Sequence, residues 1–122
     1  MYVMGVVLAV PEGNEAEYRK MAEDMAAIFM DYGALEVVEN WEVDVPDGEV
    51  TDFRKAVAAK EGEKIVFSWA TFASKEASDK AHEEMMEDER MKAQPETMPF
   101  DGKRMIFAGF RTIFSTRTEG DA

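Results

Sequence analysis

Hydrophobic residues fall into four short runs along the chain, and each run has the length and composition of a β-strand. The runs cover residues 2–10, 35–44, 64–72 and 105–114. Pro11 ends the first of them. The second run alternates apolar and polar side chains, which indicates a strand at the edge or rim of a sheet. Four strands are therefore predicted.

Two other segments carry hydrophobic residues at every third or fourth position, which is the spacing of one face of an α-helix. The first covers residues 15–32, where Asn14 and Glu17 have the spacing of a capping box. Gly33 follows directly and supplies a helix stop. The second helix is predicted over residues 75–88.

Smaller signals mark the remaining boundaries. Ser74 precedes the second helix and is expected to cap it, and Asp52 is expected to cap a short helical stretch within the connection between strands two and three. Residues 91–103 contain two prolines and an Asp-Gly pair, so this segment is predicted to be a loop.

The resulting order is β-α-β-β-α-β, which is typical of a ferredoxin-like α+β fold. Such a chain forms a four-stranded antiparallel sheet with two helices on one face. We expect residues 1–114 to form a single domain and residues 115–122 to be a polar tail.

The first and fourth strands carry apolar side chains on both faces. In strand one, Val6 and Leu8 point to one side, and Val3 and Val7 point to the other. A sheet covered by helices on one side only should have a polar second face, so the pattern predicts a further protein layer. Self-association around a two-fold axis supplies that layer, and a homodimer is predicted.

The chain of 122 residues is strongly acidic, with 26 Asp and Glu against 14 Lys and Arg and a net charge of −12. This charge repels phosphate backbones and anionic lipids, so neither nucleic acid nor a membrane surface is expected as a partner. The apolar start of the chain is too short for a signal peptide or a membrane span, which favours a cytoplasmic location. Cysteine is absent, which excludes disulfides, a cysteine nucleophile and thiolate metal sites.

Three segments carry a resemblance to a known family. They are residues 1–3, residues 44–57 and the MPFDGKRM sequence at residues 98–105, and the VFSW sequence at residues 66–69 adds to them. In these segments the chain resembles the YbaA-like family of uncharacterised bacterial proteins, and the likeness extends over residues 1–114. The resemblance implies a dimeric α+β barrel and brings no established activity or catalytic residues.

Two tryptophans and several polar residues are candidates for a ligand pocket between the sheet and the helices. Large aromatic side chains also fill protein cores without any ligand, so both interpretations stay open. The aromatic candidates are Trp41, Trp69, Tyr18 and Tyr32, and the other polar candidates are Ser68 and Asn40.

His82 is the only histidine and lies on the second predicted helix, where Asp79 is within reach. It can serve as a general base if it faces a pocket, and it is otherwise an ordinary boundary residue. A single histidine among scattered acids has no metal-ligand spacing, so no metal and no cofactor are expected.

The loop before strand four places Asp101, Lys103 and Arg104 around a turn. The two cations can hold an anionic group, because a guanidinium binds carboxylates and phosphates in a bidentate way. Alternatively, Asp101 and Gly102 form the turn while Arg104 pairs with an acidic neighbour or with a partner subunit. The structural interpretation is favoured.

Two functional classes follow from the sequence. In the first, a homodimer binds or transforms a small apolar or aromatic metabolite. In the second, the dimer is a non-enzymatic regulatory or protein-interaction module. The sequence alone does not decide whether the protein is an enzyme. A cavity lined by tryptophan and tyrosine favours the first class, and a filled interior favours the second.

Overall fold

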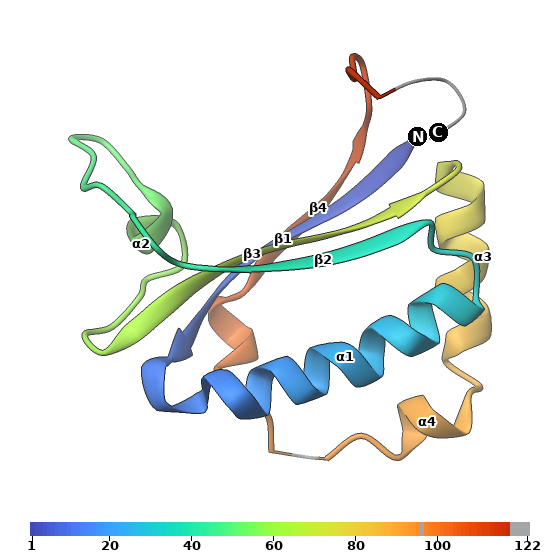
Figure 1. Cartoon of the computed structure of the whole chain (residues 1–122), viewed down its shortest axis with the longest axis horizontal. Helices are drawn as coiled ribbons and strands as arrows, with labels where there is room; N and C mark the ends of the chain where they lie inside the picture. The colour runs from blue at the N-terminus through green and yellow to red at the C-terminus, as the bar shows by residue number, and fades with distance from the viewer. Residues whose placement is uncertain (96, 118–122) are drawn as a thin grey trace.

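Two ten-residue strands form the centre of a four-stranded antiparallel sheet in the computed structural model (Figure 1). These are β1 (Tyr2–Pro11) and β3 (Glu63–Phe72), which pair along their whole length. The shorter strands β2 (Glu36–Trp41) and β4 (Ile106–Arg111) lie at the two edges. The strand order is β2-β3-β1-β4, and every neighbouring pair is antiparallel.

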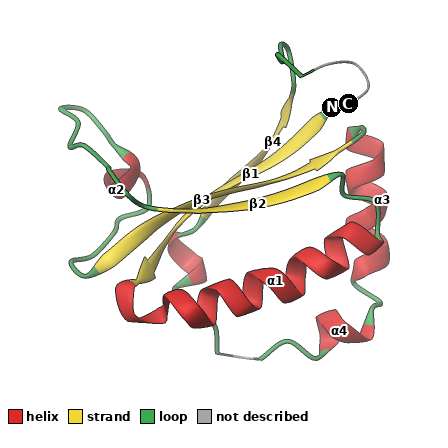
Figure 2. Ribbon diagram, viewed as in Figure 1, coloured by secondary structure: helices red, strands yellow, loops and turns green. Residues whose placement is uncertain are grey.

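In the described part of the chain, four α-helices accompany the sheet, and Figure 2 shows how they are arranged. The two longer ones, α1 (Glu15–Asp31) and α3 (Lys75–Met85), lie on one side of it, together with the short α4 (Glu89–Lys92). The short α2 (Phe53–Ala56) belongs to the connection between β2 and β3. None of the helices within the described residues is long and apolar enough to cross a membrane.

The structure describes residues 1–95 and 97–117. The predicted polar tail therefore lies partly outside the described residues, and its described part forms no helix or strand. Two further segments, Glu12–Asn14 and Gly102–Arg104, each form one turn of 3-10 helix.

Helix α1 begins at the predicted residue and ends one residue earlier than predicted, but the contacts at its N-terminus differ from the prediction. Asn14 makes no side-chain capping bond, so the predicted capping box is wrong. Its Nδ2 atom instead donates to the carbonyl oxygen of Pro99 at 3.0 Å. At the other end, Gly33 has a φ of 110°, a left-handed conformation that glycine adopts without steric strain, and this ends the helix as predicted.

The predicted caps of the other two helices are confirmed. The Asp52 side chain accepts from the backbone N–H of Lys55, and the Ser74 hydroxyl accepts from that of Ala77. The segment predicted as a loop contains the end of α4, because the Asp88 side chain accepts from the backbone of Arg90 and starts a short helix there. The fourth strand ends at Arg111, three residues earlier than predicted.

The main core lies between the helices and one face of the sheet. Leu8, Val10 and Val66 on the central strands pack against Tyr18 and Ala22 of α1. A second cluster joins Phe72 of β3 to Ala81 of α3, with Ala34 and Ala70 also buried there. Burial of these side chains is the main stabilising contribution of this layer.

The opposite face of the sheet is apolar and only partly covered. At one end, Val57 after α2 buries Ala9 and Ile65. Beyond that cover, Phe67 is 44% exposed and Phe110 is 57% exposed. The two apolar faces predicted from strands one and four are therefore present, and the second face stays largely open in the single chain.

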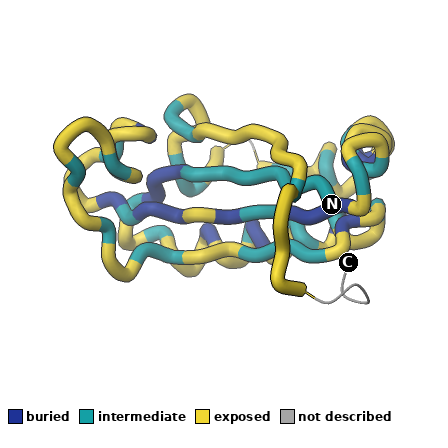
Figure 3. The backbone as a smooth tube through the Cα atoms, turned by 90° about the horizontal axis from the view of Figure 1, so that it is seen from above, coloured by how far each residue is buried: buried dark blue, intermediate teal, exposed yellow. Residues whose placement is uncertain are grey.

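Residues 112–117 cross one end of this open face (Figure 3). The backbone N–H of Thr112 donates to the carbonyl oxygen of Met1, beside the start of β1. Further along, Arg117 forms an ion pair with Glu36 on the opposite edge strand. The segment therefore spans the sheet from the β4 edge to the β2 edge.

Candidate functional site

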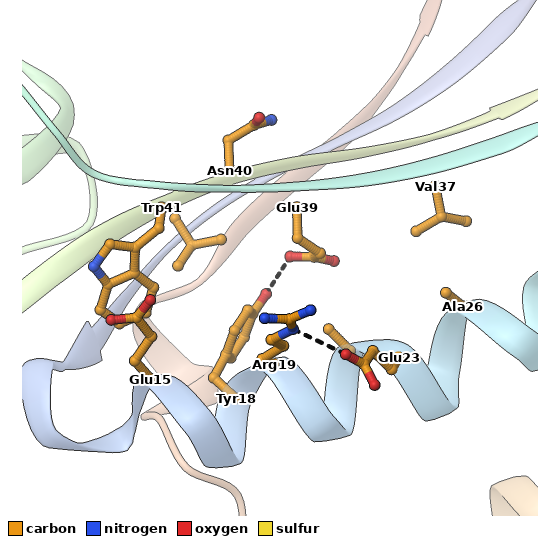
Figure 4. Close-up of a pocket in the computed structure, with 11 residues that line it drawn as sticks. Glu15, Tyr18, Arg19, Glu23, Ala26, Val37, Glu39, Asn40 and Trp41 are labelled. Atoms are coloured by element: carbon orange, nitrogen blue, oxygen red, sulfur yellow. Dashed lines mark hydrogen bonds and ion pairs between the residues drawn. The ribbon is translucent and has the colours of Figure 1, made fainter.

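A cleft of about 480 Å³ opens between helix α1 and the edge strand β2 (Figure 4). Its floor and walls are mostly hydrocarbon, and its polar groups come from α1 and from the side of β2 that faces the helix. Three of the polar residues, Glu15, Arg19 and Glu23, are one helical turn apart along α1, which places them on one side of that helix. The lining residues are Glu15, Tyr18, Arg19, Ala22, Glu23, Ala26, Val37, Glu39, Asn40, Trp41 and Val66.

The central polar contact in the cleft joins the helix to the strand. The Tyr18 hydroxyl donates to the Oε1 atom of Glu39 at 2.6 Å. The Tyr18 ring is buried and packs edge-on against Phe100, with 5.9 Å between the ring centroids. Burial, followed by the hydrogen bond to Glu39, raises the pKa of the Tyr18 phenol, so the phenol keeps its proton.

Glu39 occupies a position that the alternation of β2 assigns to the helix-facing side, between Val37 and Trp41. Its carboxylate reaches solvent through the open cleft. The surrounding protein removes part of its hydration and raises the pKa of the carboxyl group, while the hydrogen bond from Tyr18 lowers it to a smaller extent. A carboxylate with a raised pKa is the group in this cleft best able to take a proton from a bound molecule.

The rim of the cleft carries an ion pair. Arg19 Nε lies 2.9 Å from Glu23 Oε1, and both side chains are well exposed. Because water screens such a pair, it contributes little to stability. Arg19 is the one arginine among the lining residues, and its Nε is the atom that donates to Glu23.

A smaller cavity of about 130 Å³ adjoins the cleft further along α1. The two share Ala22, Ala26, Val37 and Glu39, so Glu39 lies at their junction. The smaller cavity extends to Ser68 of β3, to Phe29 of α1 and to other apolar side chains.

The structure brings together some of the residues that the sequence suggested for a pocket. Tyr18 and Trp41 line the cleft, and Ser68 lines the adjoining cavity. Asn40 borders the cleft, but its side chain points away from α1, to the other side of β2 (Figure 4). Asn40 donates its side-chain amide to the carbonyl oxygen of Phe67. Tyr18, Trp41 and Ser68 are therefore the predicted pocket residues whose side chains the structure brings together.

Trp69 borders the adjoining cavity, but its position in β3 directs the indole side chain to the open face of the sheet. Its indole Nε1 donates to Glu36 at 3.0 Å. Glu36 also accepts from Arg117, and these hydrogen bonds lower the pKa of its carboxyl group.

Two further candidates also lie away from the cleft. Tyr32, just after α1, donates its hydroxyl to Asp88 at 2.8 Å. His82 packs edge-on against Phe29, and its Nδ1 atom lies 2.7 Å from the carbonyl oxygen of Ser78, one turn earlier on α3. Both residues make contacts that hold the helices in place.

The loop with Asp101, Lys103 and Arg104 forms a structural anchor. The Asp101 side chain accepts from the backbone N–H of Lys103, which starts a turn of 3-10 helix. Arg104 binds both carboxylate oxygens of Glu63 at 2.7 Å, and its Nε donates to Asp101. The geometry favours the structural interpretation over anion binding, because Arg104 also donates to the carbonyl oxygen of Ala58 and has little donor capacity left.

Sequence reasoning missed the acidic side of the site, namely Glu39, Glu15 and Glu23, as well as Arg19. One signal was available for Glu39. It is the single charged residue in the helix-facing series of the second strand, between Val37 and Trp41. A carboxylate at a position that the alternation assigns to the interior is costly unless it has a partner or a purpose.

Comparison with known proteins places the chain in a family. Residues 1–102 match the family described as "Protein of unknown function (DUF1428)". The chain belongs to this family. The predicted resemblance is confirmed by the curated relatives, which are named "Uncharacterized protein YbaA" in Escherichia coli (strain K12) and in Shigella flexneri. Each is 55% identical to this chain over 112 residues, covering 92% of this chain and 96% of the relative.

The descriptions of the family and of these relatives name no activity, so the chemistry must be tested on this chain. We expect Tyr18→Phe to raise the pKa of Glu39 further, because the lost hydrogen bond favours the charged carboxylate. Carbon NMR of the Glu39 carboxyl group during a pH titration measures the change. Tyr32→Phe is the matched control, since its hydroxyl binds Asp88. An unchanged Glu39 titration in Tyr18→Phe would show that the hydrogen bond is not formed.

A second prediction concerns the Arg104 anchor. The hydrogen bonds from Arg104 lower the pKa of Glu63 from 4.5 to about 2. The ion pair therefore stabilises the fold fully above pH 4.5, and this contribution is lost as the pH falls towards 2. We expect Arg104→Gln to lower the melting temperature by several degrees at neutral pH and by much less in acid.

Thermal unfolding followed by circular dichroism at several pH values tests this expectation. Arg19→Gln is the control, because it removes an exposed ion pair and should change the melting temperature little at any pH. An Arg104→Gln variant that melts with the wild type at neutral pH contradicts the anchor.

Proposed function

We propose that this protein is a ferredoxin-like homodimer of the α+β barrel type that binds a small apolar or aromatic metabolite in the cleft between α1 and β2. The observation that carries the proposal is the cleft itself. It combines Trp41 and hydrocarbon walls with the Tyr18–Glu39 hydrogen bond at its centre. Ligand sites typically have this composition: a mostly apolar lining with a few fixed polar groups.

The volume of the cleft supports a small ligand. Its 480 Å³ falls within the usual range for sites that hold metabolites, and the adjoining cavity adds room behind Glu39. The cleft is open along its rim, so a ligand can enter without a change in the backbone. Proton transfer by Glu39 is the one chemical step that these residues support if the ligand is also transformed.

The dimer is supported by the open apolar face. Phe67, Phe110 and Ile106 expose about half of their surface there, and they lie side by side on β3 and β4 around Gly5 of β1. A second copy presents the same patch, so a two-fold axis brings two apolar sheets together. The strand order, with β1 and β3 at the centre, supports the ferredoxin-like arrangement that such dimers require.

A non-enzymatic interaction module is the second candidate, and the same open face favours it. In that case the apolar patch contacts a different protein, and the cleft carries no ligand. The two functions differ in what occupies the cleft and in what covers the sheet, so separate experiments on the two faces distinguish them.

The ligand is tested by filling the cleft. Ala26 lines both the cleft and the adjoining cavity, whereas its neighbour Ala27 is exposed on α1. We expect some member of a metabolite library to raise the melting temperature of the wild type, because a ligand that binds only the folded state stabilises it. Ala26→Phe should abolish this shift, and Ala27→Phe should retain it. A shift that survives in Ala26→Phe places the ligand elsewhere.

The dimer is tested on strand β4. Phe110 and Phe107 are both largely exposed, but they point to opposite faces of the sheet, because their partners on β1 are Val3 and Val6 respectively. We expect Phe110→Asp to produce monomers in sedimentation velocity at micromolar concentration, while Phe107→Asp remains dimeric. A monomeric wild type contradicts the proposal. Added salt should strengthen the dimer, since each copy carries a net charge of −12.

A further inference from the structure

We propose that the ligand of the cleft is an organic ammonium ion, that is, a protonated amine attached to an aromatic or aliphatic group. In this arrangement the ammonium group lies at Glu39 and the apolar part lies against Trp41 and the hydrocarbon walls. The inference rests on the proposed function, because it assumes that the cleft holds a ligand. It adds the charge and the chemical class of that ligand.

The charges around the cleft determine which ligands it accepts. Three carboxylates, Glu15, Glu23 and Glu39, line it against one guanidinium, that of Arg19. Arg19 is already paired with Glu23. Because the carboxylates outnumber the guanidinium, an anionic ligand meets a negative potential in the cleft, whereas a cation is attracted.

The apolar lining distinguishes an organic cation from a metal ion. Apart from the carboxylates, the cleft offers Trp41, Val37, Val66 and alanine side chains of α1. Within the described part of the chain, no group of three acidic or histidine side chains is placed to hold a metal. An indole ring attracts ammonium groups through its electron-rich face, and hydrocarbon walls favour an apolar substituent.

Glu39 has the geometry to receive an ammonium group. Tyr18 donates to its Oε1 atom, which orients the carboxylate and leaves Oε2 for a ligand donor. An ammonium group beside a partly desolvated carboxylate gains a charge-assisted hydrogen bond, which is stronger than a neutral one. A neutral alcohol in the same place forms only the weaker bond.

Three probes of similar shape and different charge test the inference on the wild type. They are phenethylamine, phenethyl alcohol and phenylacetate, which are cationic, neutral and anionic at neutral pH. Nitrogen NMR of the two indole groups reports binding, with Trp41 in the cleft and Trp69 on the other face as an internal control. We expect the amine to shift the Trp41 signal with at least tenfold higher affinity than the alcohol, and phenylacetate to leave it unchanged.

Matched variants assign the preference to Glu39. Glu39→Gln keeps an oxygen for Tyr18 and removes the charge, so the amine should then bind no better than the alcohol. Glu83→Gln makes the same change on the exposed surface of α3 and should leave the preference intact.

The outcomes separate the inference from the proposed function. If the alcohol or phenylacetate binds the cleft as tightly as the amine, or if Glu39→Gln keeps the preference, the ammonium inference is wrong and the cleft remains a ligand site. If none of the three probes shifts the Trp41 signal at concentrations up to the solubility limit of the probe, the ammonium inference is overturned. The proposed function is overturned separately, if no member of the metabolite library gives a shift in melting temperature that Ala26→Phe abolishes.

Discussion

The pairing of β1 with β3 is the constraint on which the rest of the structure depends. Both strands are ten residues long and apolar on both faces, so the sheet that they form must be covered on both sides. The helices cover one side. The α2 connection covers only an end of the other, where Val57 buries Ala9 and Ile65. The cleft and the open face therefore have the same origin. Each lies where the helices and connections of this chain do not fully cover the sheet.

The MPFDGKRM sequence at residues 98–105 does not line the cleft, but it holds one of the lining residues in place. Phe100 packs against the ring of Tyr18, and Arg104 ties the same loop to Glu63 at the start of β3. Asn14 holds the loop from the α1 side through Pro99. Together these contacts fix the phenol that orients Glu39. The most distinctive sequence of the chain therefore supports the site without lining it.

Local signals predicted the elements well, since strand alternation, the Ser74 and Asp52 caps and the stop at Gly33 each depend on residues close in sequence. The site was predicted only in part. Trp41, Tyr18 and Ser68 were identified by residue type, but the direction of Trp69 depends on the register of β3. The partner of Tyr32 is Asp88, which caps a short helix that the sequence did not reveal. Glu39 was overlooked because it was read as one more member of the alternating strand pattern, although it is a charged residue in an otherwise apolar series. The bond from Tyr18 joins residues 21 positions apart, which spacing rules do not reach.

Strand β2 directs one hydrogen-bonded carboxylate to each face of the sheet. Glu36 meets Trp69 on the open face, and Glu39 meets Tyr18 on the helix face. Their separation of three residues is odd, so the two-residue period of a strand sends them in opposite directions. Deleting or inserting a single residue between them would turn both to the same face, and a slip of the whole strand by one residue would exchange the faces. For each carboxylate to keep its own face, the number of positions that separates the two glutamates along the strand has to stay odd.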